Sequence, residues 1–210
     1  MGEYKDNNIV TVAGIVEDMP VFNHEVYKEK FYIFTLCVKR LSEVDDHIKV
    51  ILSERLFGSE FDVRAGDFVA INGQFRSYNN YSGEGSRLVL TVFAKDIRTA
   101  QPEELENPNQ IFLDGYICKE PVYRVTPFGR EISDILLAVN RSYNKSDYIP
   151  AIAWGRNAKF CRDISVGTRV RIWGRIQSRE YQKKLSEEDV VTKMAYEVSI
   201  GKMELVLDEE

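Results

Sequence analysis

The sequence contains an internal repeat: a shift of 101 residues superposes its first half on its second half without a gap. The matched pairs are Gly14 and Gly115, Pro20 and Pro121, Val21 and Val122, Phe22 and Tyr123, Leu36 and Leu137, Val38 and Val139, Arg40 and Arg141, Ile51 and Ile152, Arg55 and Arg156, Gly66 and Gly167, Val69 and Val170, Ile71 and Ile172, Gly73 and Gly174, and Ser77 and Ser178. Glycines carry most weight, because they mark turns and strand bends that other residues occupy only at a cost. The duplication predicts two copies of one domain.

Each copy is expected to form five strands and one short helix. The first copy predicts strands near 8–18, 30–40, 47–53, 67–78 and 87–97, with a helix around 55–63. The second predicts strands near 109–119, 131–141, 148–154, 168–180 and 194–206, with a helix at 156–164. Five strands with a helix between the third and the fourth is the order of the OB fold. The chain is therefore predicted to be all-β with one short helix per domain, as two tandem OB-fold five-stranded Greek-key barrels.

The two copies differ in charge. Residues 1–108 hold 12 Lys/Arg against 18 Asp/Glu, whereas residues 109–184 hold 14 against 7, on a chain whose net charge is −5. We expect an acidic N-terminal domain at 1–98, a polar, proline-flanked linker at 99–108 and a C-terminal domain at 109–210 with a basic body. The overall charge argues against a nucleic-acid partner, but the asymmetry between the segments restores that possibility for the second copy.

The segment 168–179 alternates strictly between two kinds of residue. Val170, Ile172, Gly174 and Ile176 take one parity, and Arg169, Arg171, Trp173, Arg175, Gln177 and Arg179 take the other. A period of two predicts a strand with one buried and one outward face. Four arginines on the outward face favour an anionic partner.

Residues 109–184 resemble the DNA-binding domain of bacterial single-stranded DNA-binding proteins, the SSB family. The similar segments are 111–141, 147–161 and 167–181, which follow the family's order at close to its spacing. With the duplication, the resemblance is to the tandem OB-fold form of the family. It implies OB folds and binding of single-stranded DNA, in which bases stack on aromatic rings and cations follow the phosphates.

The family places aromatic rings at four positions of its OB domain. Matched motif by motif, these positions correspond to Tyr143, Tyr148, Trp154 and Tyr181. Basic residues near them or on the outward strand complete the expected binding set: Arg141, Arg156, Arg175 and Arg179. Tyr148 and Trp154 have the same parity and should stand on one face of a strand. A single aromatic residue in a strand is more often part of the core, but basic neighbours within two residues of three of these rings favour a binding surface.

The first copy lacks these rings. Its matching residues are Ser42, His47, Ser53 and Asn80, although Tyr78 and Tyr81 lie close to the last. The first copy keeps the glycines and strand pattern of the fold but not the aromatic rings of the binding site. The first domain is therefore expected to be a weaker binder or a structural partner.

Nothing in the sequence favours catalysis, so we expect no enzyme, no catalytic residue, no metal site and no cofactor. The acidic pair Asp45-Asp46 falls in a predicted loop, where solvated charge is the ordinary interpretation. Three scattered cysteines suggest reduced thiols, and the N-terminus has no secretory signal, so a cytoplasmic protein without a membrane partner is expected.

Three functions stay open at this point. The first is a sequence-independent single-stranded DNA-binding protein that coats exposed strands in replication, recombination or repair. The second is a tandem OB-fold interaction or scaffold module with little DNA affinity, and the third is binding of RNA or an oligosaccharide, because fold alone does not fix function.

The resemblance also bears on assembly. The SSB family commonly works with four OB domains, which a two-domain chain reaches as a homodimer. The apolar alternation of 9–15 and 111–117 fits strands that pair across a subunit interface, unless the two domains of one chain satisfy each other. Trp173, on the outward parity, also favours a partner surface.

Overall fold

The structure is a computed structural model that describes residues 7–40, 42, 44–57, 62–80, 88–184 and 190–207, with the side chains of 183, 184 and 190 left aside. The first half contains strands β1 (Asn8–Val16), β2 (Val21–Val26), β3 (Glu29–Val38), β4 (Asp46–Ser53), β5 (Phe68–Asn79) and β6 (Leu88–Thr99). The second half contains β7 (Asn109–Ile117), β8 (Val122–Val125), β9 (Glu131–Arg141), β10 (Lys145–Trp154), β11 (Arg169–Lys184) and β12 (Val190–Leu205), with helix α1 (Arg156–Arg162) after β10. Short 3-10 turns occupy η1 (Glu54–Leu56), η2 (Pro102–Glu104) and η3 (Ser142–Asn144).

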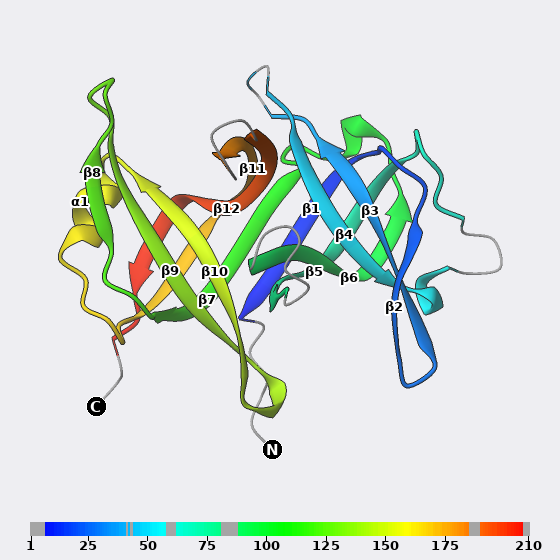
Figure 1. Cartoon of the computed structure of the whole chain (residues 1–210), viewed down its shortest axis with the longest axis horizontal. Helices are drawn as coiled ribbons and strands as arrows, with labels where there is room; N and C mark the ends of the chain where they lie inside the picture. The colour runs from blue at the N-terminus through cyan, green and yellow to red at the C-terminus, as the bar shows by residue number, and fades with distance from the viewer. Residues whose placement is uncertain are drawn as a thin grey trace.

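The strands form two matching barrels joined edge to edge, one on each side of Figure 1. Their order is β2-β3-β4-β6-β5-β1 in the first half and, continuing across the junction, β7-β11-β12-β10-β9-β8 in the second. Each barrel closes through an antiparallel pairing, β1 with β3 and β7 with β9. A parallel pairing, β4 with β6 and β10 with β12, completes the Greek-key order. The predicted tandem OB folds are thus confirmed.

An approximate two-fold axis relates the halves and passes between β1 and β7. These strands pair antiparallel, with Val10 opposite Ile111, which is its own partner in the 101-residue repeat. The edge strand of each barrel therefore hydrogen-bonds to the equivalent edge of the other within one chain. Such pairing removes two exposed edges at once. The sequence left open whether these strands pair across a subunit interface or within one chain. In the structure they pair within one chain.

The observed elements differ from the predicted ones in two respects. Each barrel has an additional short strand, β2 or β8, that pairs with β3 or β9 as a hairpin at the outer edge. The prediction of a helix around 55–63 is wrong for the residues that the structure describes, because only the 3-10 turn at Glu54–Leu56 forms there. Residues 58–61 of the predicted helix lie outside the described residues. In the second half α1 covers Arg156–Arg162 and buries Ala158 and Cys161, which gives it the apolar contact that a short helix needs.

The alternation of buried and exposed side chains along the strands accounts for the barrel cores. On β1 and β7 the burial patterns are identical, and Val10, Val12, Ile111 and Leu113 are all buried. One cluster of buried aliphatic side chains runs from the first barrel through this junction into the second. The repeated Gly14 is required by the barrel closure, because a Cβ there would lie 2.1 Å from the carbonyl oxygen of Cys37.

The segment between the halves packs against the first barrel. The backbone N–H of Ala13 donates to the Pro108 carbonyl oxygen at 2.8 Å. Leu105 packs on buried Ala13, Ala70 and Ala100. The domain limits at 98 and 109 stay a prediction, although β6 ends at Thr99 and β7 begins at Asn109. Within the described residues, no helix is both long and apolar enough to cross a membrane.

Candidate nucleic-acid interface

Strand β10 presents two aromatic rings on its outer face. Tyr148 is 48% exposed and Trp154 is 38% exposed, whereas Ile149, Ala151 and Ala153 between them are buried in the barrel. The indole Nε1 of Trp154 donates to Ser199 Oγ on β12 at 3.2 Å, which fixes the ring at the strand's end. The parity expected from the sequence is the one observed.

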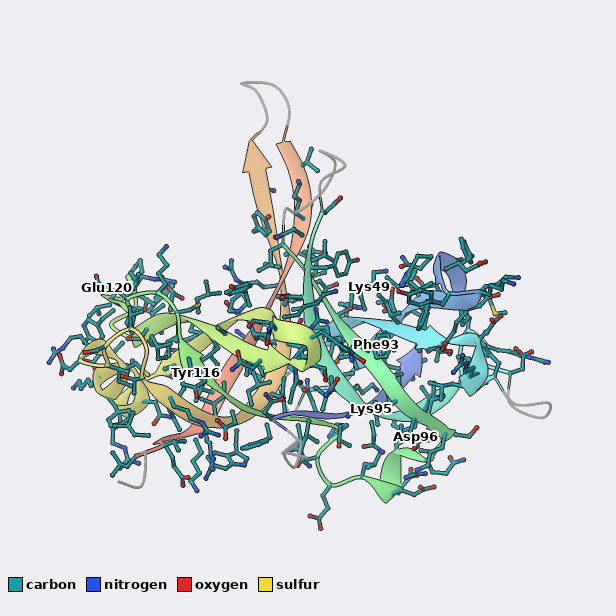
Figure 2. All side chains as sticks on the ribbon, turned by 90° about the horizontal axis from the view of Figure 1, so that it is seen from below. Lys49, Phe93, Lys95, Asp96, Tyr116 and Glu120 are labelled. Atoms are coloured by element: carbon teal, nitrogen blue, oxygen red, sulfur yellow. The ribbon has the colours of Figure 1, made fainter. Side chains whose placement is uncertain are left out.

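The other two predicted rings stand on different elements. Tyr143 is 93% exposed in the turn before β10 and has a left-handed backbone, with φ 62°. Tyr181 is partly buried on the distal part of β11, opposite Lys193 of β12. There β11 and β12 extend past the rest of the barrel as a two-stranded arm (Figure 2). The four rings are therefore distributed over β10, the turn before it and this arm.

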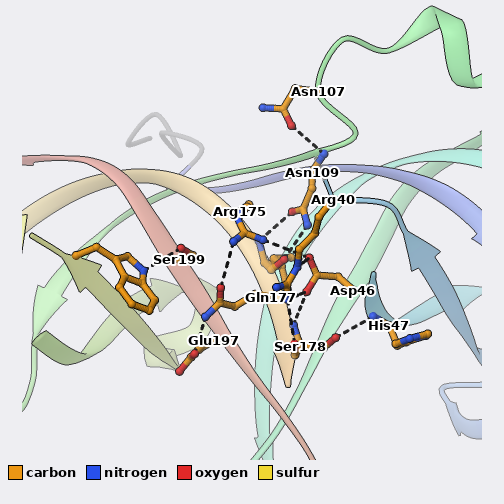
Figure 3. Close-up of polar contacts among 12 residues, drawn as sticks. Arg40, Asp46, His47, Asn107, Asn109, Arg175, Gln177, Ser178, Glu197 and Ser199 are labelled. Carbon is orange, nitrogen blue, oxygen red and sulfur yellow. Dashed lines mark hydrogen bonds and ion pairs between the residues drawn. The ribbon is translucent and has the colours of Figure 1, made fainter. Parts of the chain in front are cut away.

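A groove of about 900 Å³ joins part of the predicted site to the first half of the chain. We call it the junction groove. Its lining includes Trp154, Arg175 and Arg179 from the second half, and Arg40 and His47 from the first half. Figure 3 shows the first-half side chains beside those of β11. With Arg130 the groove holds one indole ring and four guanidinium groups, which is the chemistry that holds a single strand of nucleic acid.

The predicted arginines differ in how much they are engaged. Arg141 lies 3.4 Å from Asp147, and Arg179 lies 3.6 Å from Glu197. Arg175 lies 3.5 Å from Asp46 of the first half, and its pKa is lowered by partial burial and by neighbouring Arg40. The side chain of Arg156, exposed at the start of α1, makes no hydrogen bond or ion pair with any described residue.

The sequence suggested that the outward arginines of β11 are all free to bind an anion. The structure shows that two of them are not. Arg169 and Arg171 both contact the Asp114 carboxylate, at 2.8 and 3.1 Å. Burial would raise the pKa of Asp114, but the hydrogen bonds from these two guanidinium groups outweigh it and leave the pKa below its usual value. Trp173, between them and Arg175, packs on Phe112 with ring centroids 5.2 Å apart and under the Lys202 ammonium.

Two equivalent sets of hydrogen bonds, each between a buried aspartate of one half and a serine of the other, join the halves beside the junction groove. We call each set a clamp. In the first, the backbone N–H of Ser178 donates to Asp46 at 2.7 Å, and Ser178 Oγ accepts from the His47 N–H at 2.8 Å (Figure 3). Arg40 reaches the same carboxylate through two nitrogens.

In the second clamp, the N–H of Ser77 donates to Asp147 at 2.7 Å, and Ser77 Oγ accepts from the Tyr148 N–H at 2.7 Å. Burial raises the pKa of Asp147, against the hydrogen bond from Ser77 and the charges of Arg141 and Arg76. The expectation of a solvated Asp46 is wrong, because its side chain is fully buried in this contact.

Sequence reasoning missed the contribution of the first half to the groove. Arg40 and His47 lie more than 100 residues from Trp154, so no local pattern joins them. One signal was available: Asp46 and Asp147 occupy matching positions of the repeat, as do Arg40 and Arg141, and Ser77 and Ser178.

Comparisons with known proteins concern the half of the chain that carries the four aromatic rings. The profile of the Single-strand binding protein family matches residues 108–206. A single-stranded DNA-binding protein of Clostridium tetani is 33% identical over 93 residues, 41% of this chain and 64% of that protein. Single-stranded DNA-binding protein B of Bacillus subtilis is 31% identical over 96 residues, 41% of this chain and 82% of that protein. The match thus spans less than two thirds of the Clostridium protein's length.

A solved structure extends the likeness over both halves. The wild-type single-stranded DNA-binding protein from Thermus aquaticus superposes with a TM-score of 0.76 at 17% sequence identity, covering 97% of this chain and 94% of the other. At this identity the likeness concerns the fold, which is the same tandem arrangement of barrels.

Proposed function

Because this chain belongs to the single-strand binding protein family, we propose that it binds single-stranded DNA without sequence preference and protects exposed strands in replication, recombination or repair. Bases stack on Tyr143, Tyr148, Trp154 and Tyr181, and phosphates lie near Arg141, Arg156, Arg175 and Arg179. No sequence readout is required, because every base offers an apolar face and every nucleotide a phosphate.

The junction groove is the observation that carries this proposal. Trp154, Arg175 and Arg179 all line it, so the groove offers a base a stacking surface and its phosphates cations. Arg40 adds a further guanidinium from the first half. The N-terminal half therefore contributes to the site as a wall of the groove, while the stacking rings belong to the C-terminal half.

A fluorescence titration with oligo(dT) tests the proposal. The chain has two tryptophans, and Trp173 is packed between Phe112 and Lys202. Stacking of a base on Trp154 should therefore quench the exposed indole, and Trp154→Phe should remove most of that signal while retaining binding. Absence of binding in both fluorescence and electrophoretic assays would instead favour the scaffold function.

Salt dependence distinguishes phosphate contacts from structural arginines. Arg156→Gln should make the log–log salt slope of oligo(dT) binding shallower by about 0.7, the value for one phosphate contact on a single strand. The free energy of unfolding of the Arg156→Gln variant should equal that of the wild type, because the Arg156 side chain is exposed and unpaired within the described residues. Arg55→Gln, the matching change in the first half, is the control and should leave the slope unaltered. A loss of affinity with an unchanged slope would make Arg156 structural.

We also propose that the chain forms a homodimer with four OB domains. The strand pairing expected between subunits is used within the chain by β1 and β7, so a different surface is needed. The outer face of this junction bears a groove of about 1120 Å³ lined in part by Ile9, Ile15, Phe112 and Trp173. Ile9 and Ile15 are 43% and 40% exposed there, and exposed apolar side chains beside a groove favour a second copy as their cover.

Light scattering measures the assembly directly. The wild type should have twice the mass of the 24.2 kDa chain, and Ile9→Glu should reduce it to a single chain with an unchanged circular dichroism spectrum. Val122→Glu, at an apolar residue of comparable exposure (51%) on the outermost strand β8, should stay dimeric. A wild-type mass near 24.2 kDa with and without oligo(dT) would rule the dimer out.

We infer further that the protein is a binding protein rather than an enzyme and that it works in the cytoplasm. The family assignment supports the first inference, and three unpaired cysteines support a reducing compartment.

A further inference from the structure

Three metal-ligating side chains from separate segments meet where the first barrel closes. Cys37 of β3 lies directly opposite His47 of β4, and Glu17 follows the end of β1 beside them. A carboxylate oxygen of Glu17, Sγ of Cys37 and a ring nitrogen of His47 all lie within 4.8 Å of one another. Nδ1 of His47 is 2.8 Å from Glu17 Oε1. We call these three residues the barrel-end triad.

The backbone around the triad is held in place. The N–H of Glu17 donates to the Thr35 carbonyl oxygen at 2.9 Å. The adjacent Asp18 accepts hydrogen bonds from the N–H and the hydroxyl of Thr35. The N–H of His47 is anchored on Ser178 of the other half. A ligand set built on hydrogen-bonded strands is a preorganised one.

The repeat provides an internal comparison. At the same backbone positions in the second barrel, Glu17, Cys37 and His47 are replaced by Cys118, Ala138 and Tyr148, and Ala138 is again paired opposite Tyr148. The neighbouring Asp45, whose carboxylate lies 3.7 Å from the Cys37 thiol, is replaced by Ser146. The first barrel thus has a histidine where the second has Tyr148, with a thiol and two carboxylates around it.

We propose that the barrel-end triad binds a zinc ion through one carboxylate oxygen, one thiolate and one imidazole nitrogen. Bond lengths of about 2.0–2.3 Å in a tetrahedral zinc centre place ligand atoms roughly 3.3–3.8 Å apart, so small side-chain rotations complete the geometry. The fourth position is open to Asp45 or to water. Binding displaces the thiol proton of Cys37 to solvent, because only the thiolate is a ligand.

The local charge suits a dication. Burial raises the pKa of the Cys37 thiol, and so do the negative charges of Asp45 and Glu17, with Lys39 opposing them. A bound ion would neutralise this cluster. The mixture of one soft, one borderline and two hard ligands selects zinc or cobalt over magnesium or calcium, which prefer oxygen alone. The sequence predicted no metal site, because the ligands follow no short spacing. The β3–β4 pairing places Cys37 beside His47, and closure of the barrel by β1 and β3 adds Glu17.

Cobalt serves as a spectroscopic probe for this site. The reduced, untagged full chain, freed of metal, is titrated with Co²⁺ alone. The expected result is one ion per chain, with a thiolate-to-cobalt charge-transfer band in the near ultraviolet and intense visible bands of tetrahedral cobalt. Zinc should displace the cobalt and raise the melting temperature, since a ligand of the folded state stabilises it.

Two variants use residues that the second barrel already accommodates at these positions. Cys37→Ala should abolish the charge-transfer band and the zinc-dependent rise in melting temperature, and His47→Tyr should weaken zinc binding at least tenfold. Cys118→Ser and His24→Gln, at the remaining half-buried cysteine and the other histidine, should change neither readout. Absence of a charge-transfer band in the wild type, or its persistence in Cys37→Ala, would overturn the proposal.

Discussion

Asp46→Ala is expected to lower the free energy of unfolding by about 3 kcal/mol, the lower end of the range for breaking a buried ion pair. The Asp46 side chain is fully buried, and its loss leaves the Ser178 N–H without an acceptor and Arg40 without a counterion. The value stays at the lower end because Arg175, the other partner, keeps 40% of its side chain exposed and can be hydrated. Chemical denaturation monitored by circular dichroism measures the change.

A surface ion pair supplies the matched control. Asp62→Ala removes a carboxylate 3.1 Å from Arg64, with both side chains at least 65% exposed. Its cost should stay below about 1 kcal/mol, as for other exposed pairs. Equal losses from the two variants would mean that the clamp between the halves contributes no more than a surface contact.

Trp154→Ala should weaken the binding of oligo(dT) by about 1–3 kcal/mol, the usual value for a base stacked on an aromatic ring. This corresponds to about 5- to 140-fold in the dissociation constant. The indole is more than one third exposed and lies in the junction groove, so its removal takes away a stacking surface and little of the core. Fluorescence anisotropy of a labelled oligonucleotide measures the affinity without relying on tryptophan.

Ser53→Ala is the corresponding change in the first half. Ser53 is buried and accepts a hydrogen bond from the N–H of Arg55 as the cap of η1, so this variant should lose about 1 kcal/mol of stability. Its affinity for oligo(dT) should be that of the wild type. A similar loss of affinity in both variants would contradict the division of roles between the halves.

The repeat and the strand periods predicted the two barrels because both signals are local. A residue such as Val170 or Ile172 is buried according to its own parity, and Gly14 is fixed by the backbone that must pass beside it. The exposure of Tyr148 and Trp154 could be predicted in the same way. Strand β2 and its counterpart β8 were missed, since these short hairpin strands have mostly exposed side chains and no buried parity to reveal them.

Charged side chains could not be assigned from local patterns. Arg169, Arg171 and Arg175 share one parity and look equivalent in sequence, yet the first two contact Asp114 and the third contacts Asp46 of the other half. Whether an outward guanidinium is free for a phosphate depends on which carboxylate the fold places within 4 Å of it.

The sequence alone determined two OB folds and the exposure of Tyr148 and Trp154, because each follows from spacing within one strand or one repeat, while the family and the full set of rings came from the resemblance. Only the tertiary structure decided how the halves meet. The pairing of β1 with β7 places Asp46 on Ser178 and closes the junction groove with Arg40 and His47. Closure of the first barrel likewise brings Glu17 beside the paired Cys37 and His47. These contacts join residues that are distant along the chain, and their geometry is set by barrel closure and by the two-fold packing rather than by any local pattern.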